Sequence, residues 1–128
     1  MAPTTVLIVD DSRLARIVAS KLVKQLKPEW ELVEAANADD ALAHAAQGRV
    51  DVALIDFNMP GQDGLALAAQ LRETRPELPI AIISANIQDE IIARARAVNA
   101  TFVAKPVTEE GLSGFLSGAG LRLRKLST

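Results

Sequence analysis

The middle of the chain contains a short apolar run that ends in an acidic residue, Val52-Ala53-Leu54-Ile55-Asp56-Phe57-Asn58-Met59-Pro60. An apolar run bounded by turn residues is typical of a strand that is buried on both faces of a sheet. Asp56 would then stand at the carboxyl end of this strand, where open α/β sheets bind ligands. An aspartate in this place more often only caps the next turn, so the ends of the other strands must separate the two interpretations.

Four further segments have the character of strands. Three of them, at residues 6–9, 80–83 and 101–104, are apolar runs, whereas residues 30–35 are more mixed and indicate an edge strand. Each strand is followed by a helical pattern, which predicts a (βα)5 chain. We expect an α/β fold with a doubly wound, five-stranded parallel sheet in the order 2-1-3-4-5, the flavodoxin-like arrangement. Its binding crevice lies between strands one and three.

The helices have recognisable ends. Asp11 or Ser12 can cap the first, which ends at Lys27-Pro28. Its apolar positions are Leu14, Ile17, Val18, Leu22 and Leu26. The second helix should run from Asn37 to a left-handed Gly48, and the third from Asp63-Gly64 to Arg75-Pro76. The fourth should pass through Ile91 to Val98, and the fifth should begin at about Thr108. Four glycines in the last helix cost roughly 1 kcal/mol each against alanine, so we expect its later part to be weak.

Length and composition exclude several classes of protein. A chain of 128 residues with 49% hydrophobic and 23% charged residues fits one globular domain, which we place at residues 1–128. A formal net charge of -2 offers no basic patch for nucleic acid. The absence of cysteine excludes disulfides and thiol nucleophiles. No transmembrane segment or signal peptide is visible, so we expect a cytoplasmic protein with no membrane partner.

Polar side chains follow all four apolar strands. Asp10 and Asp11 follow the first, Asp56 the third, Ser84 the fourth and Lys105 the fifth. Because the carboxyl ends of parallel strands lie at one edge of a sheet, these side chains should converge. Each alone is more simply a cap or a solvated residue, but their joint placement indicates a site.

The residue types at this edge favour phosphoryl chemistry. Three close carboxylates resist ionisation unless a cation neutralises them. A few hard oxygen ligands suit Mg²⁺ better than Ca²⁺, and zinc would need more histidine or cysteine. A lysine beside the metal attracts a phosphoryl group, a serine hydroxyl can donate to it, and an aspartate can be the nucleophile that accepts it.

These residues resemble the receiver domain (CheY-like) of two-component response regulators over essentially the whole chain. The resemblance rests on residues 9–12, 56–64, 84–85 and 105–106 in this order and spacing. It implies that Asp56 is the phosphoacceptor, that Asp11 ligates Mg²⁺ directly and that Asp10 acts on the metal mainly through water. It also implies a metal ligand in the backbone carbonyl of Asn58, a cis bond at Lys105-Pro106, and partners of two kinds. These are a histidine kinase or histidine phosphotransfer protein, and a downstream output.

The resemblance also assigns a conformational switch to Ser84 and Phe102, where Ser84 bonds the phosphoryl group and Lys105 pairs with Asp56. Phe102 lacks the hydroxyl of a tyrosine, so its switching would be a change of packing. Asn58 and Asn86 would flank the path of the attacking water and set the acyl phosphate lifetime. The segment 98–101 lacks an acidic pair, so we expect a monomer or a weak, phosphorylation-dependent dimer.

Two alternatives belong to other classes of protein. A haloacid-dehalogenase-like phosphatase also uses an aspartyl nucleophile with Mg²⁺, but it needs a second aspartate where this chain has Asn58, and a cap insertion. A receiver-like docking module that is never phosphorylated would be expected to lack an acidic residue or the lysine. The single histidine, His44, lies on an alanine-rich helix and is interpreted as a surface residue.

Overall fold

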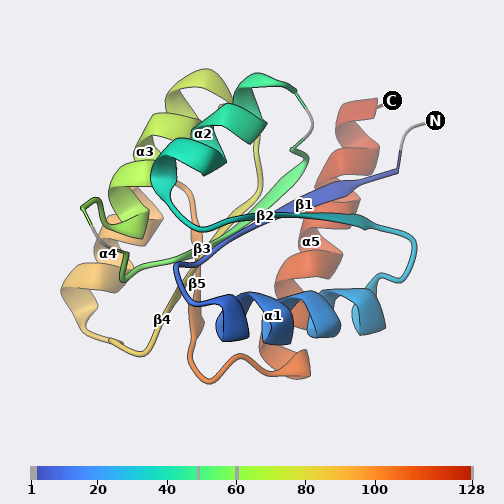
Figure 1. The fold of residues 1–128 in the computed structure, drawn as a ribbon. Coiled ribbons are helices and arrows are strands. Elements are labelled where there is room, and N and C mark those ends of the chain that lie inside the picture. Colours follow the sequence, from blue (N-terminus) through green and yellow to red (C-terminus); the bar gives the residue numbers. More distant parts are fainter. Residues whose placement is uncertain (1–2, 49, 60, 128) are drawn as a thin grey trace.

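The computed structural model describes residues 3–48, 50–59 and 61–127, and within them five strands alternate with five helices (Figure 1). Pro60, the last residue of the central stretch, lies outside the described residues. The strands are β1 (Thr5–Val9), β2 (Glu31–Ala35), β3 (Val52–Asp56), β4 (Ile80–Ser84) and β5 (Thr101–Ala104). The helices are α1 (Arg13–Leu26), α2 (Ala38–Ala46), α3 (Gly64–Thr74), α4 (Asp89–Ala97) and α5 (Glu109–Ser127).

The sheet is parallel and has the strand order β2-β1-β3-β4-β5, which confirms the predicted fold class. Every residue of β1, β3 and β4 is buried, as expected of strands covered on both faces, whereas β2 is only partly covered at its edge. The register sets Val9 beside Ile55 and Asp56 beside Ile83. The strands therefore end together, and the residues that follow them share one edge.

Helices cover both faces of the sheet (Figure 1). One apolar core lies between the sheet and α2, α3 and α4, and it includes the fully buried Ile55, Leu67 and Ile82. The other lies between the sheet and α1 and α5, and it includes Leu54 and Leu112. Two separate cores on one sheet fix the sheet from both sides and leave its carboxyl edge free for a site. Among the described residues, no helix combines the length and apolarity needed to cross a membrane.

Side-chain caps start the helices where the sequence predicts. Ser12, Asn37 and Asp63 accept hydrogen bonds from backbone N–H groups at the starts of α1, α2 and α3. Thr108 does the same for α5 through the N–H of Gly111. Gly48 after α2 has a φ of 75°, the predicted left-handed conformation.

Three expectations need correction. The apolar stripe predicted for α1 is wrong in its first half, because Leu14 is 70% and Val18 47% exposed while the helix packs through Ala19 and Val23. Strand β2 begins at Glu31, since Trp30 instead packs with the core beneath α1 and α5. Helix α5 continues to Ser127 despite its glycines, because its buried positions, such as Leu112, are apolar.

Candidate functional site

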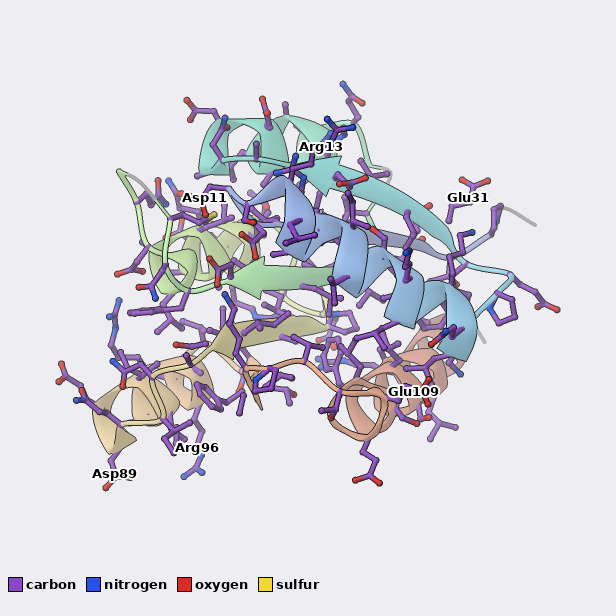
Figure 2. All side chains as sticks on the ribbon, turned by 60° about the horizontal axis from the view of Figure 1, so that its bottom comes forward. Asp11, Arg13, Glu31, Asp89, Arg96 and Glu109 are labelled. Atoms are coloured by element: carbon purple, nitrogen blue, oxygen red, sulfur yellow. The ribbon has the colours of Figure 1, made fainter. Side chains whose placement is uncertain are left out.

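Three carboxylates meet at the carboxyl edge of the sheet. Asp10 and Asp11 follow β1, and Asp56 is the last residue of β3. Each offers a carboxylate oxygen, and these oxygens all lie within 4.8 Å of one another. Figure 2 shows Asp11 in the segment that leads into α1. The convergence predicted from the strand ends is therefore present at the switch point between β1 and β3.

Lys105 faces the buried member of this cluster. Its Nζ lies 2.7 Å from Oδ1 of Asp56, whose side chain is only 4% exposed. The contact is an ion pair and does not have the geometry of a hydrogen bond, and the buried Oδ1 accepts no hydrogen bond from the described part of the chain. A buried carboxylate needs a compensating charge, and one lysine among three carboxylates leaves the cluster negative. The chemistry of this donor set fits a divalent cation with a preference for hard oxygen ligands.

The position of Asp10 in the cluster is electrostatically unfavourable for its ionised carboxylate. Its side chain accepts a hydrogen bond of 2.9 Å from the N–H of Ser12. Burial, followed by the charges of Asp56 and Asp11, raises the pKa of Asp10 above its ordinary value of 3.8, although the Ser12 bond and Lys105 act in the opposite direction. The ionised form of Asp10 therefore destabilises the folded protein when no cation is bound.

Replacing Asp10 with asparagine is expected to stabilise the metal-free protein at pH 7 by about 1 kcal/mol, because a like charge leaves the cluster while the acceptor for Ser12 remains. Since the folded-state pKa is raised, the parent loses stability as pH rises from 3.8 through the raised value, and the variant lacks this loss. Urea unfolding at several pH values measures the stability difference at pH 7 and the pH dependence of each protein's stability. In saturating Mg²⁺ the order should reverse; a variant less stable than the parent in metal-free buffer at pH 7 would contradict the assigned repulsion.

Ser84 and Phe102, the residues of the predicted switch, lie on the neighbouring strands β4 and β5. Ser84 ends β4 and is buried, and its Oγ accepts a hydrogen bond of 3.0 Å from the N–H of Asn86. Phe102 on β5 is half-buried and packs against the core under α4. Its register partner is Ile82 of β4. The roles of both residues remain predictions.

The two asparagines differ in their surroundings. Asn58 is exposed in the segment after β3. Asn86 is half-buried, and its Oδ1 accepts a hydrogen bond of 3.1 Å from the N–H of Gln88. Asn86 therefore also shapes the segment before α4. The Lys105–Pro106 peptide bond is cis, as the family resemblance implies. His44 lies on α2 and is half-buried, not fully exposed.

An apolar hollow adjoins the acidic cluster. It has a volume of about 330 Å³, and its lining includes Asp10, Asp56 and Lys105 together with apolar residues of α1 and of the segment after β5. The apolar wall includes Leu14, Val18, Pro106 and Val107. The sequence pattern missed this hollow, because apolar residues at helical spacing were assigned to the core.

Gly64 has a structural role that the sequence did not reveal. A Cβ at this position would clash with the carbonyl oxygen of Asp56 and would lie 2.9 Å from Cγ2 of Ile55. The N–H of Gly64 also donates a 2.8 Å hydrogen bond to the carbonyl of Phe57. Helix α3 thus starts against the backbone that presents Asp56. A glycine directly after the capping Asp63, where other residues favour a helix more, was the available signal.

A five-stranded flavodoxin-like sheet with an acidic cluster and a paired lysine at its switch point defines a class of small α/β signalling domains. The family model described as "Response regulator receiver domain" matches residues 6–116. The chain therefore belongs to the response regulator receiver family of two-component systems. The phosphatase alternative is set aside by this match.

Individual relatives agree with the family. The chain is 34% identical over 125 residues to the cyclic di-GMP phosphodiesterase response regulator RpfG of Xanthomonas campestris pv. campestris, covering 95% of this chain and 33% of the relative. It is 40% identical over 117 residues to the positive alginate biosynthesis regulatory protein of Pseudomonas aeruginosa, covering 89% and 46%. The chain thus spans less than half the length of these curated relatives.

A solved structure gives the same result for the fold. The chemotaxis protein CheY4 of Vibrio cholerae superimposes with a TM-score of 0.82 at 30% identity, covering 92% of this chain and 99% of that one. The similarity extends over almost the whole of a chain that is itself a receiver-sized protein.

Proposed function

We propose that residues 1–128 form a single receiver domain that accepts a phosphoryl group on Asp56 from a partner's phosphohistidine and transmits the change to an output. The supporting observation is the buried Asp56 carboxylate, which is paired with Lys105 inside a cluster of three carboxylates. The donor would be a histidine kinase or a histidine phosphotransfer protein. A receiver is a signalling switch, and some relatives carry it together with an enzymatic output, as RpfG does by its name.

Asp10, Asp11, Asp56 and the backbone carbonyl of Asn58 would hold Mg²⁺. When bound, the ion neutralises the carboxylates and the charge of the incoming phosphoryl oxygens. The fit rests on the three converging carboxylates and on the buried Asp56 carboxylate, whose charge only Lys105 balances among the described residues. The raised pKa of Asp10 supports it as well, because it marks a cluster that gains stability from an added positive charge.

The transfer itself needs little from the protein besides placement and charge. A carboxylate oxygen of Asp56 attacks phosphorus, an oxygen–phosphorus bond forms, and the phosphorus–nitrogen bond of the phosphohistidine breaks, leaving the imidazole to the partner. Lys105, already 2.7 Å from Asp56, stays beside the phosphoryl oxygens. Burial of the carboxylate lets these charges act in a site of low dielectric constant.

The signal would travel from Ser84 to the surface around β5. The Ser84 hydroxyl already accepts from Asn86, and its proton could be donated to a phosphoryl oxygen. Such a movement would disturb the segment before α4 and the packing of Phe102. Because Phe102 carries no hydroxyl, a change of packing alone would expose or cover the α4–β5–α5 face. We propose a cytoplasmic protein that is a monomer or a weak, phosphorylation-dependent dimer, with no direct contact with nucleic acid or membrane.

Phosphorylation by a small phosphodonor tests this function. The parent, incubated with acetyl phosphate and Mg²⁺, should acquire one phosphoryl group that resists acid and is lost in base. The Asp56→Asn variant and the parent in EDTA should acquire none. Equal labelling of parent and variant would refute the assignment, and an unlabelled parent would favour a docking module.

The two asparagines are expected to affect only the lifetime of the acyl phosphate. In Asn58→Ala and Asn86→Ala, dephosphorylation should slow by roughly 3-fold, under 1 kcal/mol of barrier, because an amide that orients the attacking water is lost. The phosphorylation rate should stay the same. Decay of labelled protein after removal of the donor measures the effect, with thermal unfolding as the control for Asn86, whose side chain also bonds Gln88. Unchanged decay in both variants would exclude this role.

A further inference from the structure

Arg16 occupies an unusual place on α1. Its side chain is only 15% exposed, whereas the apolar Leu14 and Val18 on the same helix are largely exposed. Arg16 shares a helical stripe with Ala19 and Val23, at spacings of three and seven residues, and this stripe is the one that faces the sheet. A charged side chain is thus the first member of the sheet-facing stripe of α1.

Arg16 uses its covered position to hold the backbone of Asp10. Its Nη1 donates a short hydrogen bond of 2.6 Å to the carbonyl oxygen of Asp10. Its Nε donates to Oε1 of Glu34 on β2 at 3.0 Å. The N–H of Asp10 donates to the carbonyl of Ala35 at 3.1 Å. Asp10 is therefore held on both sides of its Cα, by the end of β2 and by Arg16.

The carbonyl that Arg16 holds belongs to the peptide bond between Asp10 and Asp11. The orientation of this peptide sets the directions in which both carboxylates leave the backbone. The Asp10 side chain is further restrained by the N–H of Ser12, whereas Asp11 is exposed. The direction of Asp11 thus depends on the backbone that Arg16 restrains.

Stability alone does not account for this arrangement. The side chain of Glu34 is 47% exposed, and an ion pair of this kind contributes little to folding. The bond from Nε of Arg16 to Glu34 instead fixes the plane of the guanidinium, so that Nη1 points at the carbonyl oxygen of Asp10. An arginine can make both bonds from one rigid fork, whereas a lysine cannot.

We propose that Arg16 is a positioning residue, which holds the peptide between Asp10 and Asp11 so that their carboxylates converge with Asp56 on a divalent cation. This inference rests on the metal site of the proposed function. A positioning role and a purely electrostatic role predict opposite changes in cation affinity when Arg16 is replaced. By charge alone, removing a nearby positive charge would strengthen cation binding. Loss of positioning weakens it.

The test is Mg²⁺ affinity, measured by calorimetric titration of the full chain without phosphodonor. Arg16→Met and Arg16→Lys should both bind Mg²⁺ about 10-fold more weakly than the parent, the usual cost of losing a group that orients metal ligands. Matched variants at the exposed Arg13 (Figure 2), Arg13→Met and Arg13→Lys, control for charge and should bind at least as tightly as the parent. Circular dichroism at the titration temperature selects conditions in which each variant is folded.

A second readout separates positioning from general damage. In Arg16→Lys, the Mg²⁺ concentration for half-maximal phosphorylation should rise about 10-fold, while the rate at saturating Mg²⁺ stays within twofold of the parent. Binding of Mg²⁺ by Arg16→Met as tightly as by the parent, or more tightly, would overturn the proposal. If the parent binds Mg²⁺ but Asp56 is not phosphorylated, the proposed function fails and the positioning role stands.

Discussion

Arg72→Met is expected to lower the free energy of unfolding by about 3 kcal/mol, because it leaves the part-buried carbonyl groups of Val98 and Leu78 without their donor and removes three further bonds. Arg72 lies on α3, and its guanidinium donates to five backbone carbonyls. Nε bonds Val98 at 2.9 Å, Nη2 bonds Asn99 at 3.2 Å, and Nη1 bonds Leu78, Pro76 and Arg75 at 2.7, 2.9 and 3.2 Å. These carbonyls come from the α3–β4 connection and the turn between α4 and β5. One side chain thus joins three segments next to the proposed switch surface.

The pKa of Arg72 agrees with its covered position. Burial, together with the charge of Arg122, lowers this pKa, but an arginine keeps its charge throughout the working pH range. Urea unfolding measures the loss of stability, and a fall in melting temperature of roughly 10 °C should accompany it. Arg96→Met, at an exposed arginine of α4 that Figure 2 labels, should change stability by less than about 0.5 kcal/mol. Equal stability of the two variants would contradict the role of the carbonyl contacts.

Gly64→Ala is expected to destabilise the protein by about 2 kcal/mol and to displace Asp56. The added Cβ would clash with the Asp56 carbonyl oxygen and approach its carbonyl carbon to 2.9 Å. Because the obstacle is backbone in a buried strand, either α3 or the end of β3 must move. A movement at this place shifts the phosphoacceptor itself, so the phosphorylation rate should fall together with stability.

Gly114 provides a control of opposite sign. It also lies in a helix, but among the described residues a Cβ there would meet no atom within 4 Å apart from its chain neighbours and the nearby backbone of its own helix. Gly114→Ala should therefore stabilise the protein by roughly 0.5–1 kcal/mol through helix propensity and leave phosphorylation unchanged. Denaturant unfolding and phosphorylation kinetics of both variants check the pair. A Gly64→Ala protein that matches the parent in both would show that α3 can move without disturbing Asp56.

The sequence was informative wherever a local pattern dictates the outcome. Apolar runs with turn residues at their ends predicted four of the five strands, because burial on both faces leaves a continuous apolar pattern, and the mixed pattern of the remaining strand placed it at the edge. The convergence of Asp10, Asp11 and Asp56 followed from parallel strands that end at one edge. The caps at Ser12, Asn37 and Asp63 could be predicted because each side chain accepts a hydrogen bond from the first turn of the helix that follows it.

The features that sequence reasoning missed all depend on contacts between distant segments. Arg16 bonds Glu34, and Arg72 bonds the turn after α4, so neither contact has a local signature. Exposure of Leu14 was missed because helical spacing alone does not say which stripe faces the sheet. The sequence predicts Gly64 at the start of a helix, but its close approach to Asp56 appears only when α3 is packed on β3.

Chemical location of the phosphoryl group tests the central claim most directly. Borohydride reduces an aspartyl phosphate to homoserine, which mass spectrometry of peptides can place at one residue. After incubation with acetyl phosphate and Mg²⁺, the parent should yield homoserine at position 56, and omission of Mg²⁺ should abolish it. Homoserine at another position, or none in protein that binds Mg²⁺, would contradict the assignment of Asp56 as the phosphoacceptor.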